Sequence, residues 1–130
     1  MSDLSDVTDS ARRCMARQIF YDTFFGRLGA AVPEAAELFK DADEVVLKNF
    51  LRNAITLILS DAAGSRHAAD KLAQVRERHG PSDLNLNPEW FPPWIEAVIV
   101  AARTADPQIN HALETAWRKV ITPGVQKVIP

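Results

Sequence analysis

The sequence predicts an all-α fold. Two long segments place apolar residues at the spacing of one helical face, and prolines and glycines separate such segments along the chain. No segment shows the strict apolar–polar alternation of a half-buried strand. Of the 130 residues, 47% are hydrophobic and 25% charged, so the chain can bury a core without disulfides or structural metals. Because we find no internal repeat or low-complexity tract, we expect a single domain over residues 1–130.

The first two helices are predicted from their caps. Thr8 or Asp9 can cap a helix that runs through the region 12–28, and Asp43 can cap the next one. The second helix has a complete apolar face, which consists of Leu47, Phe50, Leu51, Ala54, Ile55 and Ile58. Residues 54–59 alone would also fit a buried strand. The helical spacing before them and the lack of a turn favour a helix.

Prolines and glycines set the next boundaries. Ser65 can cap a short helix that ends at Gly80–Pro81, and residues 80–88 form a loop. Pro92 and Pro93 fit only in the first turn of the following helix, where their missing N–H groups are not needed.

The last helix has a predicted beginning and end. Asp106–Pro107 is interpreted as a cap followed by proline at the first helical position. Pro123–Gly124 should kink or end this helix. Its apolar side contains Ile109, Leu113, Ala116, Trp117 and Val120.

Composition and charge exclude several classes of function. The formal net charge of −2 leaves no reason to expect the basic surface that nucleic acid requires. No apolar run is long enough to cross a membrane, and residues 1–13 lack the apolar core of a signal peptide. Cys14 is the one cysteine, so it cannot form an internal disulfide. We expect a cytoplasmic protein that binds neither nucleic acid nor membrane.

Among the three histidines, His79 has the most informative position. It is in register with Ala68, Leu72 and Val75, a spacing that puts all four residues on one face of the short helix. On spacing alone, we favour a histidine stabilised by the dipole at the helix end, with Gly80 as the C-cap. The alternative is that the His79 side chain serves as a ligand. One cysteine and scattered histidines do not make a zinc site.

Aromatic residues gather on the first two predicted helices and in the segment between them. They are Phe20, Tyr21, Phe24, Phe25, Phe39 and Phe50. Such residues usually form the core, but a large flat apolar ligand also needs a slot lined by aromatic and aliphatic groups. Tyr21 is the only tyrosine, and its hydroxyl needs a hydrogen-bond partner if it is buried. Both interpretations of these aromatic residues, as core residues and as the lining of a ligand slot, remain open at this point.

The order of these features resembles the globin family over nearly the whole chain. Phe20–Phe25 resembles the bacterial globin segment whose tyrosine faces the distal side of the haem. Glu37–Phe39 is similar to the turn whose phenylalanine packs flat on the haem. Leu47–Ile55 is similar to the distal helix.

The second half of the chain carries the same resemblance. Val75–Gly80, followed by Leu86–Phe91, is similar to the proximal histidine and the start of the next helix. Ala116–Trp117 resembles the closing helix of flavohaemoglobins. Tyr21 combined with a distal leucine resembles the globin-coupled sensors, and Phe91 stands where flavohaemoglobins carry a tyrosine. The first helix of the family looks shortened here, or merged with the second.

The resemblance implies a globin fold around haem b, whose iron is held by His79. The second ring N–H of His79 would go to a backbone carbonyl of the same helix. At the distal position the alignment gives Leu47 and then Leu51, which leaves Tyr21 as the polar group above the iron. The residues implied to contact the haem are Tyr21, Phe24, Phe39, Leu47, Phe50, Leu51, Leu72, Val75, His79, Leu86 and Phe91.

The implied function is reversible binding of a diatomic gas (O2, NO or CO) for sensing or buffering. One alternative is an NO dioxygenase, which would need an external reductase because no flavin or nicotinamide segment is present. Another is a haem-free interaction module, which His79 and the aromatic slot disfavour. We expect a reductase or a signalling partner, and the oligomeric state stays open, with a homodimer as one option.

Overall fold

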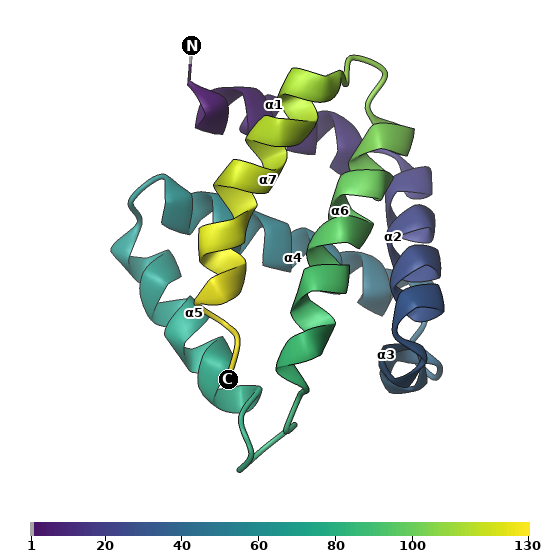
Figure 1. Cartoon of the computed structure of the whole chain (residues 1–130), viewed down its shortest axis with the longest axis vertical. Coiled ribbons are helices and arrows are strands. Elements are labelled where there is room, and N and C mark those ends of the chain that lie inside the picture. Colours follow the sequence, from purple (N-terminus) through teal and green to yellow (C-terminus); the bar gives the residue numbers. More distant parts are fainter. Residues whose placement is uncertain (1) are drawn as a thin grey trace.

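The computed structural model describes residues 2–130, and every regular element within them is a helix (Figure 1), which confirms the predicted fold class. The helices are α1 (Asp3–Met15), α2 (Gln18–Ala31), α3 (Pro33–Phe39), α4 (Glu44–Ala62), α5 (Arg66–Arg78), α6 (Phe91–Ala105) and α7 (His111–Gln126), with a 3-10 turn at Pro88–Trp90. Across this described range, no helix is both long and apolar enough to cross a membrane.

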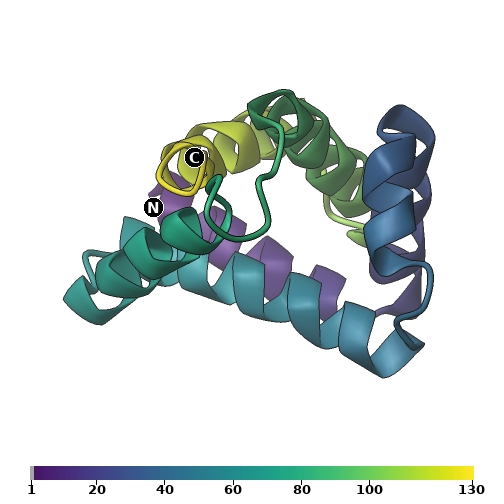
Figure 2. The same cartoon turned by 90° about the horizontal axis from the view of Figure 1, so that it is seen from below.

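The helices cross in two layers. In Figure 1, α6 and α7 lie side by side while α1 and α4 cross behind them, and Figure 2 shows the two layers from below. Helix α2 packs along α6, and α1 and α4 both pack against α7. Helix α5 contacts α4 and lies on the side of the molecule opposite α2. This arrangement brings α4, α5, α6 and the end of α7 around one region of the interior.

Several predicted boundaries are confirmed. The Asp43 carboxylate caps α4 by accepting the backbone N–H of Val46 at 2.9 Å. The Ser65 hydroxyl caps α5 by accepting the backbone N–H of Ala68 at 3.1 Å. The proline pair after Phe91 lies in the first turn of α6, where no intrahelical bond is lost.

The predicted single helix over 12–28 is wrong, because the chain breaks at Ala16 and Arg17. Helix α1 is a separate helix of 13 residues whose N-cap is Ser2. The Tyr21 hydroxyl donates to the carbonyl oxygen of Met15 at 2.7 Å, and the Arg17 guanidinium donates to a carbonyl at the end of α6 at 2.9 Å. These side chains satisfy carbonyls at two helix ends, so the break needs neither proline nor glycine.

Asp106–Pro107 does not begin the last helix, which corrects the sequence prediction. Helix α7 starts at His111, and its N-cap is Asn110. The Asp106 carboxylate instead accepts hydrogen bonds from Ser10 at 2.6 Å and from Arg13 at 2.8 and 2.9 Å. Trp117 donates its indole N–H to the Ser10 hydroxyl at 2.9 Å. We call these four residues (Ser10, Arg13, Asp106 and Trp117) the polar corner.

The electrostatics of the polar corner follow from this pairing. Burial raises the pKa of the Asp106 carboxyl, but the hydrogen bonds from Arg13 and Ser10 lower it by more. The net result is a pKa of about 2, against an ordinary value of 3.8. Asp106 is therefore a buried carboxylate that stays charged at neutral pH.

Helix α7 continues through Pro123 and Gly124 to Gln126, so the proline–glycine pair, which was expected to kink or end the helix, does not end it. Gly124 packs against α4 so closely that a Cβ there would lie 2.8 Å from the Ile58 side chain. The contact requires a residue without a side chain and keeps the end of α7 on α4.

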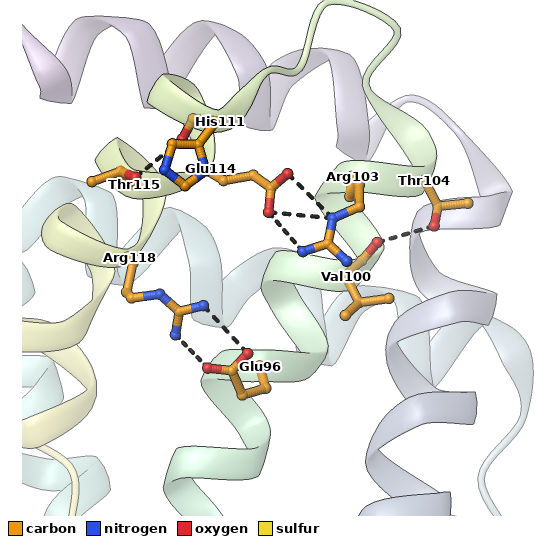
Figure 3. A network of polar contacts seen from close by, with 8 residues as sticks. All are labelled: Glu96, Val100, Arg103, Thr104, His111, Glu114, Thr115 and Arg118. Atoms are coloured by element: carbon orange, nitrogen blue, oxygen red, sulfur yellow. Dashed lines mark hydrogen bonds and ion pairs between the residues drawn. The ribbon is translucent and has the colours of Figure 1, made fainter.

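The outer faces of α6 and α7 are joined by two arginine–carboxylate pairs (Figure 3). Arg103 donates to Glu114 at 2.7 Å, and Arg118 pairs with Glu96. At least one side chain of each pair is about half exposed, so each pair contributes little to stability.

Candidate functional site

An apolar cavity of about 280 Å³ lies between α4, α5, α6 and the end of α7. Its lining consists of Phe50, Asn53, Ala54, Leu57, Ile58, Leu72, Val75, His79, Phe91, Trp94, Val125 and Val128. Ten of these twelve side chains are hydrocarbon or indole, and the exceptions are His79 and Asn53. A concave apolar space with few polar groups is the usual form of a small-molecule site.

Helix α4 can line this cavity because it has apolar residues on two adjacent faces. Leu51 and Ile55 are fully buried in the core beside α1 and α7. Phe50, Ala54 and Leu57 face the cavity instead. The small Ala54 side chain leaves room in the cavity wall, and Phe50 is 44% exposed at the rim.

His79 is the C-cap residue of α5, one turn beyond Val75. Leu72 is buried and Val75 is half-buried on the same side of the helix, so the predicted apolar register is confirmed. The imidazole also lies beside Phe91, with ring centroids 5.6 Å apart. An imidazole thus sits at the inner end of an apolar stripe.

The ring of His79 is held by a hydrogen bond to an acceptor that lies outside its own helix. Its Nδ1 lies 2.9 Å from the carbonyl oxygen of Val128, whereas the sequence analysis expected a carbonyl of α5. The carbonyl of Val75 accepts the backbone N–H of His79, not its ring. Because a carbonyl only accepts, the neutral ring carries its proton on Nδ1 and has its lone pair on Nε2.

The cavity contains five of the residues expected to contact a ligand: Phe50, Leu72, Val75, His79 and Phe91. Leu86 is half-buried just outside it, and its backbone N–H donates to the carbonyl of His79 at 2.9 Å. Phe39 lies one ring away from the lining, 5.2 Å from Phe50 between ring centroids.

The other expected contacts lie elsewhere. Phe24 and Leu51 are fully buried in the core. Leu47 lines a separate small hollow between α2, α3 and α4. Leu47 and Leu51, the predicted distal residues, thus do not line this cavity, and the residues of α4 that face it begin with Phe50 and continue with Asn53 and Ala54.

Tyr21 does not line the cavity. Its side chain is 2% exposed, its hydroxyl donates to Met15, and its ring packs edge-on against Phe20 with centroids 5.5 Å apart. Burial raises the pKa of the Tyr21 hydroxyl, which keeps it protonated as a donor. Tyr21 thus braces the junction of α1 and α2.

Seven lining residues were not predicted from the sequence: Asn53, Ala54, Leu57, Ile58, Trp94, Val125 and Val128. The first four follow Phe50 at helical spacing, so a register anchored on Phe50 would have found them. No pattern in the sequence indicates Val125 and Val128, because their place depends on helix α7 continuing past Pro123.

The described part of the chain holds no cluster of three or more histidine, cysteine or acidic side chains that could bind a metal by itself. The chemistry of the cavity is that of one imidazole surrounded by apolar walls.

No protein-family model and no curated protein matches the sequence. Among solved structures, the chain is similar to the crystal structure of protein PA3967 from Pseudomonas aeruginosa PAO1, described as structurally highly homologous to a human hemoglobin. The TM-score is 0.90 at 26% identity, over 98% of this chain and 95% of that chain.

The helical order, the crossing layers and this similarity define an all-α protein with the globin fold. This similarity confirms the resemblance to the globin family that the sequence indicates.

Proposed function

We propose that this globin binds haem b through His79 and uses it to bind a diatomic gas reversibly, for sensing or ligand buffering. The observation that carries the proposal is the lone imidazole in an apolar cavity, whose Nδ1 hydrogen bond leaves the lone pair on Nε2. Iron is bound by such a neutral histidine in many haem proteins.

The residues present fit a haem group. A porphyrin is flat and mostly apolar, and the cavity offers flat aromatic surfaces from Phe50, Phe91 and Trp94. Leu72 and Val75 supply aliphatic contacts on the histidine side. Haem held there would supply an iron centre that takes up O2, NO or CO.

The remaining roles belong to residues of the protein itself. The hydrogen bond that the His79 ring donates to the Val128 carbonyl orients the imidazole, and apolar side chains form most of the cavity wall around it. His79 carries the one ionisable side chain among the described lining residues, and Asn53 the one amide. A lining without a second acid or base supports reversible binding over a reaction that needs proton transfer.

The test is a titration of the purified protein with haemin, followed by an absorption spectrum of the ferric protein and of the reduced protein under CO. We expect a saturable Soret band at one haem per chain. His79→Gly should abolish the native band, and added imidazole should restore part of it by occupying the space of the missing ring. His67→Gly and His111→Gly are matched controls, because both residues are exposed and outside the cavity. An unchanged spectrum for His79→Gly would contradict the proposal.

A further inference from the structure

We propose that the segment Lys127–Pro130, which follows α7, is the element that positions His79 and sets the strength of its bond to a bound iron. We call it the C-terminal segment. The inference rests on the proposed function, and it adds a positioning role for a part of the chain that shows no such role in the sequence.

The first support is the hydrogen bond itself. Val128 supplies the acceptor for the ring of His79 at 2.9 Å, across 49 residues of sequence. Val128 is 8% exposed and lines the cavity beside the imidazole. Figure 1 shows the end of the chain lying next to the end of α5. The orientation of His79 therefore depends on where this segment lies.

The second support is that an ion pair and a close helix contact anchor the C-terminal segment to α4. The Lys127 ammonium contacts both carboxylate oxygens of Asp61, at 2.7 and 2.9 Å. The Asp61 side chain is 6% exposed, so this ion pair is shielded on one side. One turn earlier, Gly124 packs directly on Ile58 of α4. The acceptor that faces His79 is thus held by the helix on the opposite side of the cavity.

This arrangement links two walls of the cavity through one carbonyl group. A hydrogen bond on the second ring nitrogen raises the basicity of a ligating histidine, and losing such a partner costs about 10–100-fold in metal affinity. The neutral carbonyl of Val128 gives an intermediate effect, while a carboxylate in its place would give a larger one. Displacing the C-terminal segment should therefore weaken the iron–histidine bond as well as haem affinity.

Two shortened chains test this: one changes the acceptor of the His79 hydrogen bond, and the other removes it. A stop after Val128 leaves a terminal carboxylate that can still accept from His79. A stop after Lys127 removes the acceptor but keeps the Lys127–Asp61 pair. Helix content by circular dichroism shows whether each chain folds. Asp61→Asn keeps the full length of the chain and weakens only the Lys127–Asp61 ion pair. It therefore replaces the chain that stops after Lys127 if that chain fails to fold.

The first readout needs no haem. The ¹⁵N shifts of the His79 ring in the apoprotein should show Nδ1–H in the full chain and in the chain that stops after Val128. The chain that stops after Lys127 should show a mixture of the two tautomers.

The second readout is the iron–histidine stretching frequency of the ferrous haem protein, measured by resonance Raman. We expect the highest frequency for the stop after Val128, an intermediate one for the full chain and the lowest for the stop after Lys127. The haem affinity of the chain that stops after Lys127 should fall by about 10–100-fold. Asp61→Asn should shift the frequency in the same downward direction by less.

The outcomes separate the two proposals. If the full chain binds haem through His79 but all variants share one frequency and one tautomer, the positioning role is overturned and the proposed function stands. If the full chain binds no haem, the proposed function fails, and the tautomer measurement still decides whether the C-terminal segment orients the ring.

Discussion

The polar corner and the cavity differ in how the chain treats its buried groups. At the polar corner, a carboxylate, a hydroxyl, an indole and a guanidinium satisfy one another, and the Asp106 side chain is fully buried. In the cavity, one imidazole faces about 280 Å³ of space between apolar walls. One region is filled and paired, while the other is hollow.

The difference shows where stability and function reside. A buried charge is tolerated only with its partners, so every member of the polar corner matters to folding. A hollow lowers stability because its walls lack contacts.

The largest effect is expected from Asp106→Ala. It removes the acceptor for Ser10 and Arg13 and leaves a half-buried guanidinium without its partner, so the free energy of unfolding should fall by about 3 kcal/mol. Urea denaturation followed by circular dichroism measures this. Glu114→Ala breaks the exposed pair with Arg103 and is the matched control, with an expected loss of at most about 1 kcal/mol. Equal losses of unfolding free energy in the two variants would show that the polar corner contributes no more to stability than an exposed ion pair does.

The same carboxylate gives a pH dependence. Its folded pKa of about 2 lies below the ordinary 3.8, so the unfolded chain binds the proton more readily. The contribution of Asp106 to stability is therefore complete only above about pH 5 and is lost progressively as the pH falls through 3.8 and then through the folded pKa of about 2. The stability difference between the wild type and Asp106→Ala should shrink in this acid range.

A substitution that fills the cavity should raise the free energy of unfolding instead of lowering it. Ala54→Leu places three more carbon atoms in the hollow, so the apoprotein should gain about 1.5 kcal/mol of stability, as cavity-filling changes commonly do. Haem binding should weaken because the added side chain takes the space of the ligand. Ala62→Leu at the exposed end of α4 is the control. A variant that is less stable and binds haem normally would show that the hollow is not the ligand space.

The smallest effect is expected from Tyr21→Phe. The change removes the hydrogen bond to Met15 and should cost about 1 kcal/mol of stability. Because Tyr21 lies outside the cavity lining, the dissociation rates of O2 and CO should stay nearly unchanged. Stopped-flow measurements of both gases check this. A rise in the O2 rate alone would return Tyr21 to the distal side that the sequence predicted.

Local chemistry made part of the fold predictable. The caps Asp43 and Ser65, the prolines of α6 and the register of His79 depend on neighbouring residues, and the structure has them as predicted. The break between α1 and α2 depends on side-chain bonds to Met15 and Ala105, and the second of these partners lies 88 residues from Arg17. No local pattern contains that information.

The residues of α4 that face the cavity could not be identified from the sequence for a related reason. Helix α4 has apolar residues on two adjacent faces, and periodicity shows that both can be buried without showing what each contacts. Leu47 and Leu51 fit a distal wall as well as Phe50 and Ala54 do. Only the packing of α4 against α7 decides between them.

The close approach of Gly124 to Ile58 has an evolutionary consequence. A glycine inside a helix is less favourable than alanine by about 1 kcal/mol, so drift at position 124 would favour alanine if the space allowed it. With a Cβ only 2.8 Å from the isoleucine side chain, it does not. The two positions can change only together. A homologue with alanine at 124 should carry a smaller residue, such as valine or alanine, at 58, and this covariation would record the helix contact in sequences alone.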